Sequence, residues 1–436
     1  MFYVFFLLLA AVCFLEFSKS GASPLVNLIA ALFSTLFIAS SIYFVWLATN
    51  ISATYFYIIA AICLIAVIYF RAAEYKEVLK RLSFAPSWTS IIFLIGLVII
   101  MPKLSAHISN WGRWDAVAIW NLHAKFLFHT SLWTSYLRAD MEWTHPDYPL
   151  FLPASIAFFW KTQGSIDSLI PFLLSLFFTL SIPIVLFSAL PKHTFSQKII
   201  AVSTPLLLLS NDTYLKWFLA QMADAPLSLA YLLAFVYLRI FEVSRNNGAL
   251  FIAATLVSAS VWIKNEGVVF LISFLLVVFI YQSRSDWRYL VRMTVVVTVT
   301  LFIPMYFKVF FAPTNDLVSA FNFQDLTMKF MDFSRYKLII KHSFGALKSS
   351  DLYLLLLIPS VFVLTNWKVR ELLFSLSFKA LLLCSVFYFF IYLFTPKELN
   401  WHLETSSVRL LLHIIPSFCF ILFSIFGHKK QETIKY

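Results

Sequence analysis

The sequence predicts an all-α integral membrane protein, on the evidence of its composition, its long apolar runs and the placement of its basic residues. Of 436 residues, 61% are hydrophobic and 12% are charged, whereas soluble proteins carry about 25% charged residues. The 49 Phe and 13 Trp suit lipid-facing surfaces and interfacial belts. The four cysteines stand in apolar runs without metal-ligand spacing, so we interpret them as core or lipid-facing thiols.

The apolar runs predict about thirteen transmembrane helices, within a range of roughly 11–14, because a spanning helix needs roughly 20 residues. The first run lacks a basic n-region and a cleavage site, which favours a retained span over a signal peptide. No repeat or linker divides the chain, so we expect residues 1–436 to form a single membrane domain. The runs lie at 3–16, 25–48, 54–70, 89–101, 166–190, 199–213, 222–241, 249–263, 266–282, 289–311, 352–366, 373–394 and 407–427.

Clusters of Lys and Arg mark the connections that we place in the cytoplasm, following the positive-inside rule. They fall on alternate connections if residues 149–163 form a juxtamembrane helix instead of crossing the membrane. Residues 102–165 then form a large external loop, and the C-terminus is cytoplasmic. The basic residues are Arg71, Lys76, Lys80, Arg81, Lys192, Lys198, Arg239, Arg245, Arg284, Arg288, Arg292, Lys368, Arg370, Lys429, Lys430 and Lys435.

The net charge of +12 does not indicate a nucleic-acid partner, because the basic residues stand in short clusters between apolar runs. One connection departs from the alternation. Residues 313–351, a second external loop by parity, contain five basic residues. These residues could form a surface that binds anionic headgroups or a phosphorylated lipid. Alternatively, they indicate that a nearby span has been miscounted. These residues are Lys329, Arg335, Lys337, Lys341 and Lys348.

The longest polar insertion between apolar runs, residues 102–148, contains Asp115 at the start of a predicted helix. Trp114, Ala118 and Lys125 follow helical spacing, so we expect an amphipathic helix lying at the membrane surface. A carboxylate at a helix N-terminus is favoured by the helix dipole, and Asp115 could therefore be a helix cap. Other charged sites on the same face favour a functional role.

Three more charged sites stand at helix ends on the predicted external face. Asp224 begins a span, where an ionisable group is costly unless it has a partner or a function. Lys264 and Glu266 lie between two runs and could pair with each other or snorkel. Arg409 lies at the boundary of the last run. Together these sites predict a cavity with carboxylates for acid–base chemistry and cations for a phosphate.

These motifs resemble those of the GT-C superfamily of integral-membrane glycosyltransferases, which includes protein O-mannosyltransferases and the lipid A aminoarabinose transferase. The resemblance covers most of the chain after residue 89, and the order of the motifs carries it. They are Asp115 in the first large external loop, Asp147-Tyr-Pro-Leu-Phe-Leu-Pro, Asp224-Ala-Pro-Leu at the start of a span, Lys264-Asn-Glu-Gly267 between spans, and Arg409 followed by a Leu run and Pro416.

The resemblance implies a polyprenyl-phosphate sugar donor and a lipid, glycan or protein acceptor, on the external face of a bacterial inner membrane. Asp115 would be the general base that deprotonates the acceptor hydroxyl, and transfer would proceed by single displacement with inversion. Asp224 would position the acceptor or a metal. Lys264 and Arg409, with Lys125, would hold the donor phosphate as its charge grows. Family members differ in metal use, so the cofactor is unknown and a divalent metal is left open.

The chain departs from the family pattern at Asp115, which stands in Trp-Asp-Ala instead of beside a second acid. Asp147 or Asp224 must then supply the second carboxylate. Several spans precede the catalytic loop, where the family often has one, and we expect no soluble C-terminal domain. We assign substrate binding to the polar and aromatic residues around these groups: Trp114, His145, Tyr148, Glu266, His402 and Glu404.

A transporter or flippase for a lipid-linked sugar is the main alternative, since it also needs many spans and charged residues near the membrane. Against it, the sequence shows no repeated half and no pair of Gly- or Pro-broken helices, and the charges gather at one interface. A non-enzymatic assembly subunit is a third alternative. Release of polyprenyl phosphate by the purified protein would separate these classes.

Overall fold

The computed structural model describes residues 2–49, 51, 53–81, 87–282, 287–315, 323–355, 357 and 369–426, and every regular element among them is a helix. Eight of these helices are long and apolar enough to cross a membrane. This architecture confirms the predicted class, a helical membrane protein. The eight are α1 (Phe2–Phe17), α2 (Pro24–Thr49), α4 (Trp88–Ser105), α7 (Leu169–Ala189), α10 (Asp224–Ser244), α13 (Trp287–Phe310), α19 (Leu376–Phe394) and α20 (Leu399–Phe426).

Four other helices coincide with predicted apolar runs. They are α3 (Ala53–Arg81), α8 (Phe195–Ser210), α11 (Asn247–Ile263) and α12 (Glu266–Gln282). The count of about thirteen spans stays a prediction, because length and apolarity do not show which helices cross. The run at 352–366 lies largely outside the described residues, as do Arg284, Lys368, Lys429, Lys430 and Lys435.

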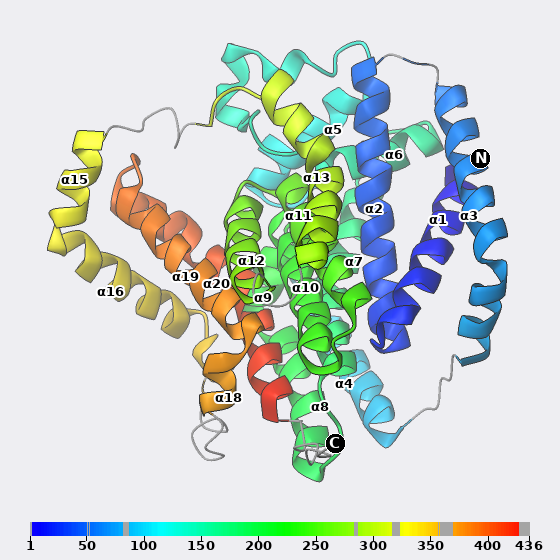
Figure 1. The fold of residues 1–436 in the computed structure, drawn as a ribbon. Helices are drawn as coiled ribbons and strands as arrows, with labels where there is room; N and C mark the ends of the chain where they lie inside the picture. Colours follow the sequence, from blue (N-terminus) through cyan, green and yellow to red (C-terminus); the bar gives the residue numbers. More distant parts are fainter. Residues whose placement is uncertain are drawn as a thin grey trace.

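Helix α10 forms the centre of the bundle (Figure 1). It packs against α7, α11 and α20, and all its residues from Asp224 to Leu238 are buried. A helix that is apolar on all sides belongs in such a core. The helices α1 and α3 flank the bundle on one side, and α15 (Phe323–Met331) and α16 (Phe333–Ser349) flank the other.

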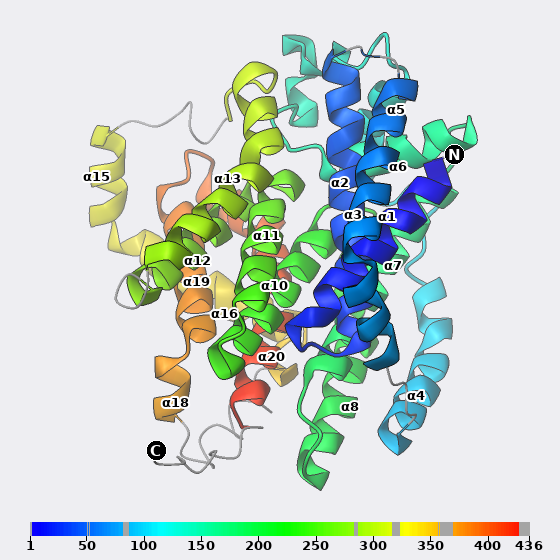
Figure 2. The same ribbon diagram turned by 45° about the vertical axis from the view of Figure 1, so that its right-hand side comes forward.

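Connections that the sequence assigns to opposite faces lie at opposite ends of the bundle. In both views the segment between α5 (Asn121–Phe128) and α6 (Phe151–Gln163) and the last turns of α13 lie at the upper end, while α8 and α18 (Val369–Phe374) reach the lower end (Figures 1 and 2). The basic connections at Lys192 and Arg370 belong to the lower end. Which end faces the cytoplasm stays a prediction.

The predicted external loop folds into short helical segments. Helix α4 continues through Pro102 to Ser105, so the loop begins slightly later than expected. A π-helical turn, η2 (Ala116–Trp120), leads into α5 (Asn121–Phe128), and η3 (Ser135–Leu137), η4 (Ala139–Thr144) and α6 (Phe151–Gln163) follow. The helix expected after Asp115 is therefore present. Its apolar face, which includes Trp120 and Ala124, is buried inside the protein, where α5 packs against α6.

The basic segment 313–351 is also mainly helical where it is described, and two of its cations hold α19 in place. Arg335 donates to the carbonyls of Leu393 at 2.9 Å and Tyr392 at 3.2 Å, and Lys329 donates to the carbonyl of Thr395 at 2.9 Å. Cations at the C-terminus of a helix bind its free carbonyls and interact favourably with its dipole. Lys329 and Arg335 therefore have a structural role as capping residues, whichever side of the membrane this end of α19 lies on.

Candidate functional site

Asp224, the first residue of α10, lies at the centre of an ionic cluster. Its side chain has no exposed surface. Oδ1 lies 3.1 Å from Lys264 Nζ and 2.8 Å from His413 Nε2, and Oδ2 accepts hydrogen bonds from Arg409 Nε at 3.1 Å and Nη2 at 2.8 Å. A buried carboxylate is tolerated only with partners of this kind. Asp224 therefore ties the start of α10 to the end of α11 and to α20.

Arg409 of α20 joins Asp224 to Asp115. Its Nη1 donates to Asp115 Oδ2 at 2.8 Å, across 294 positions of sequence. The Asp115 side chain is 30% exposed and that of Arg409 is 15% exposed. The guanidinium also lies over the ring of Trp217, at 5.6 Å from its centroid, which favours the cation. Asp115 thus approaches Arg409 from the accessible side, while Asp224 holds it from within.

The break between α11 and α12 brings Lys264 and Glu266 to the same cluster. Lys264 Nζ lies 2.8 Å from Glu266 Oε1, and the two side chains are 5% and 23% exposed, so the pairing considered from sequence is present. The break requires Gly267, since a Cβ there would lie 2.1 Å from the carbonyl oxygen of Ser260. Each of the two cations, Lys264 and Arg409, therefore contacts buried Asp224 and one partly exposed carboxylate.

Asp147 adjoins this cluster through Asn265, the residue between Lys264 and Glu266. Its Oδ2 accepts hydrogen bonds from Asn265 Nδ2 at 2.8 Å and from Asn315 Nδ2 at 2.6 Å. Lys308 Nζ lies 3.9 Å from the same oxygen and donates to the Asp147 carbonyl and, at 2.7 Å, to Asn265 Oδ1. Three segments that are distant in sequence, around residues 147, 265 and 308–315, thus meet at the Asp147 side chain.

Gln221 fixes the segment before Asp115 against the segment before Asp224. Its Nε2 donates to the carbonyls of Ser109 at 2.8 Å and Asn110 at 3.3 Å, and its Oε1 accepts from Asn121 at 3.2 Å. Gln221 has φ of +60°, a left-handed conformation that persists in a non-glycine residue only where its surroundings enforce it. These bonds set the relative position of the two aspartates.

Tyr148 follows Asp147 and stacks between two aromatic rings, Trp120 at 5.4 Å and His145 at 4.9 Å between centroids. Burial raises the pKa of the Tyr148 phenol well above its ordinary value, and the negative charge of Glu266 raises it further. The hydroxyl therefore stays protonated and is a hydrogen-bond donor beside the cluster.

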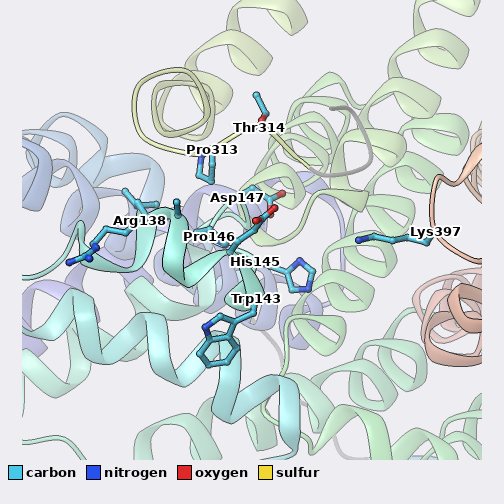
Figure 3. Close-up of a pocket in the computed structure, with 11 residues that line it drawn as sticks. Arg138, Trp143, His145, Pro146, Asp147, Pro313, Thr314 and Lys397 are labelled. Carbon is cyan, nitrogen blue, oxygen red and sulfur yellow. The ribbon is translucent and has the colours of Figure 1, made fainter. Parts of the chain in front are cut away.

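A cavity of about 520 Å³ opens next to Asp147 (Figure 3). Its walls come from the segment 137–147, from the chain after α13 and from the connection between α19 and α20. Lys397 extends from that connection toward His145 and Asp147. Its lining residues are Leu137, Arg138, Ala139, Glu142, Trp143, His145, Pro146, Asp147, Pro313, Thr314 and Lys397.

The structure brings together seven of the residues singled out from sequence, with His145 at the edge: Asp115, Asp147, Tyr148, Asp224, Lys264, Glu266 and Arg409. The other four predicted site residues lie apart from this group. Lys125 lies over the Trp111 ring at 4.7 Å, and His402 Nδ1 lies 2.9 Å from Thr395 Oγ1. Trp114 is 77% exposed, and Glu404 is exposed on α20.

Sequence reasoning missed His413, Asn265, Lys308 and Gln221. The spacing of His413 carries a usable signal, because it follows Arg409 by four positions and so shares its helix face. Asn265 lies within the Lys264-Asn-Glu-Gly267 motif that the sequence analysis identified. Lys308 and Gln221 carry no local signal, since their partners lie 161 and 112 positions away.

Among the described residues, no group of three or more His, Cys, Asp or Glu side chains is placed to hold a metal ion. Comparison of the chain with protein-family models, curated proteins and solved structures gives no match.

Proposed function

We propose that this protein is a membrane glycosyltransferase that transfers a sugar from a polyprenyl-phosphate donor to an acceptor hydroxyl at the end of the bundle that carries Asp115. The observation that supports the proposal most directly is the arrangement of carboxylates around Arg409. One side of its guanidinium is bound to fully buried Asp224, and Nη1 is bound to Asp115, which is 30% exposed. The Asp115 contact is therefore the exchangeable one.

The donor phosphate takes the place of Asp115 at Arg409 Nη1 and the place of Glu266 at Lys264 Nζ. Arginine and lysine are effective phosphate ligands, and arginine offers a planar set of donors. Asp224 remains bound to both cations and keeps them oriented. Its role is positioning, because a side chain without exposed surface does not reach the reacting atoms.

Displacement of Asp115 from Arg409 leaves a carboxylate free to accept a proton. The acceptor oxygen attacks the anomeric carbon, and the bond between that carbon and the phosphate oxygen breaks. Polyprenyl phosphate leaves with the electron pair, and the acceptor proton passes to Asp115. A positioned general base contributes about a hundredfold or more to such a step. Positive charge fixed at the leaving phosphate stabilises the charge that develops there.

The order of the acidic and basic motifs, which resembles the GT-C superfamily, supports the same assignment. By that resemblance the site faces the periplasm or exterior of a bacterial inner membrane, with a cytoplasmic C-terminus. Cations of the chain itself, Lys264 and Arg409, bind the phosphate.

The test uses the purified protein in lipid nanodiscs with a polyprenyl-phosphate sugar labelled in the sugar and an extract of envelope acceptors. We expect release of polyprenyl phosphate together with transfer of the label, and loss of both in Asp115→Asn. A transporter or flippase would move the intact donor between leaflets without releasing polyprenyl phosphate. Movement of the intact donor without release of polyprenyl phosphate would refute the transferase and indicate a transporter or flippase.

A further inference from the structure

The cavity beside Asp147 has a lining that is neither apolar nor of one charge. Glu142 and Asp147 provide carboxylates, Arg138 and Lys397 provide cations, and Trp143 and His145 provide flat rings. Its volume of about 520 Å³ falls within the range of roughly 300–1,000 Å³ that is typical of small-molecule sites. The mouth is accessible, since Trp143 is 57% exposed.

This lining suits a neutral polyhydroxyl ligand. An anionic headgroup would meet Glu142 and Asp147, and a cation would meet Lys397, so either charge encounters repulsion. A sugar hydroxyl can donate to a carboxylate and accept from an ammonium or guanidinium in the same site. The C–H faces of a pyranose ring pack on aromatic rings such as Trp143, as other apolar surfaces do. An isoprenoid chain would offer these charged and polar side chains only apolar surface and would remove solvent from them, which is unfavourable.

The cavity also lies next to the ionic cluster. Asp147 belongs to its lining, and the same carboxylate is bound by Asn265 at 2.8 Å. Asn265 stands between Lys264 and Glu266, whose side chains pair within the cluster at 2.8 Å. A ligand in the cavity therefore lies against Asp147, which is hydrogen-bonded to the residue next to Lys264, one of the cations that hold the donor phosphate in the proposed mechanism.

We propose that this cavity is the acceptor subsite and that the acceptor enters it as a neutral saccharide, the carbohydrate portion of a glycan or glycolipid. This inference rests on the proposed transferase function, which it deepens by naming the acceptor class. Trp143 and His145 bind the faces of the sugar, and Glu142, Asp147 and Lys397 bind its hydroxyls.

The test measures binding of the full-length protein, fluorescently labelled in lipid nanodiscs that contain no glycoside detergent, to an array of neutral mono- and oligosaccharides. We expect at least one saccharide to bind. Trp143→Ala should weaken that binding about tenfold, which corresponds to about 1.4 kcal/mol, and Glu142→Gln should weaken it as well. The matched control is Trp287→Ala, because Trp287 is 68% exposed and lies on α13 outside the cavity. It should bind like the unaltered protein.

Binding that is absent, or unchanged in both Trp143→Ala and Glu142→Gln, overturns the inference. So does preferential binding of a Ser- and Thr-rich peptide included on the same array. The transfer assay separates this inference from the proposed function. Saccharide binding without release of polyprenyl phosphate would refute the transferase and leave the binding site. Transfer with an acceptor KM that Trp143→Ala does not raise would refute the acceptor subsite and leave the transferase.

Discussion

Replacement of Asp115 by Asn separates a catalytic base from a structural partner of Arg409. Asn keeps the size of the side chain and one carbonyl oxygen, which can still accept the hydrogen bond from Arg409 Nη1, seen at 2.8 Å with Asp. It cannot accept a proton at neutral pH. It also ranks beside Asp as a residue at helix N-termini, so the local helix should persist.

The two roles predict losses of different size. The Asp115–Arg409 pair is partly open to solvent, with side chains 30% and 15% exposed, and pairs of this kind contribute about 1 kcal/mol or less to stability. Loss of a general base should lower kcat about a hundredfold or more, or about 2.7 kcal/mol in the barrier. Affinity for polyprenyl phosphate should be retained or increased, because Asn competes less well than a carboxylate for Arg409.

The assay combines transfer kinetics with the thermal midpoint and with binding of polyprenyl phosphate, all in nanodiscs. The expected pattern is a large loss of kcat with a nearly unchanged midpoint and no loss of phosphate binding. Turnover within about threefold of the unaltered protein, a change of less than 0.7 kcal/mol in the barrier, would refute the role of Asp115 as base. A large fall in the thermal midpoint would instead identify Asp115 as a structural ion-pair partner.

The substitution Asp224→Asn removes the buried negative charge and places an amide NH2 group against the Lys264 and Arg409 side chains, which are already donors. We therefore expect a loss of about 3–5 kcal/mol in unfolding free energy, measured by thermal unfolding. The exposed Asp140→Asn is its control, and equal midpoints would contradict the buried cluster. His123 is fully buried and its pKa falls to about 3, mainly through burial. Acid therefore favours the unfolded chain, whose histidine titrates near 6.5, and about 2 kcal/mol of stability should disappear as pH falls from 8 to 5. His123→Gln should flatten that dependence, and an unchanged slope would exclude His123 as its source. Cysteine at exposed Ser131, in a variant without native cysteines, should react with an impermeant thiol reagent added from outside, whereas cysteine at exposed His193 should react only after permeabilisation. The reverse labelling pattern would show that the protein has the opposite orientation in the membrane.

The helical membrane class and the approximate place of most helices follow from the amino-acid sequence. Inside a bilayer every backbone polar group must be satisfied within the protein, so a long apolar run adopts a helix whatever its neighbours are. The helices α2, α7 and α10 match predicted runs closely. The motifs at Asp224, Lys264 and Arg409 were also visible, because charge at the end of an apolar run is costly and stands out.

Which of these charges meet depends on how the helices pack. Arg409 lies 185 positions from Asp224 and 294 from Asp115, and local periodicity carries no information about such pairs. The same holds for Lys308 and Gln221, which reach their partners across the bundle. Lys125 and Trp114 share the helix of Asp115, yet their side chains face Trp111 and the exterior. Residues three or four apart share a helix face, but the partner of that face is set by the packing of whole helices.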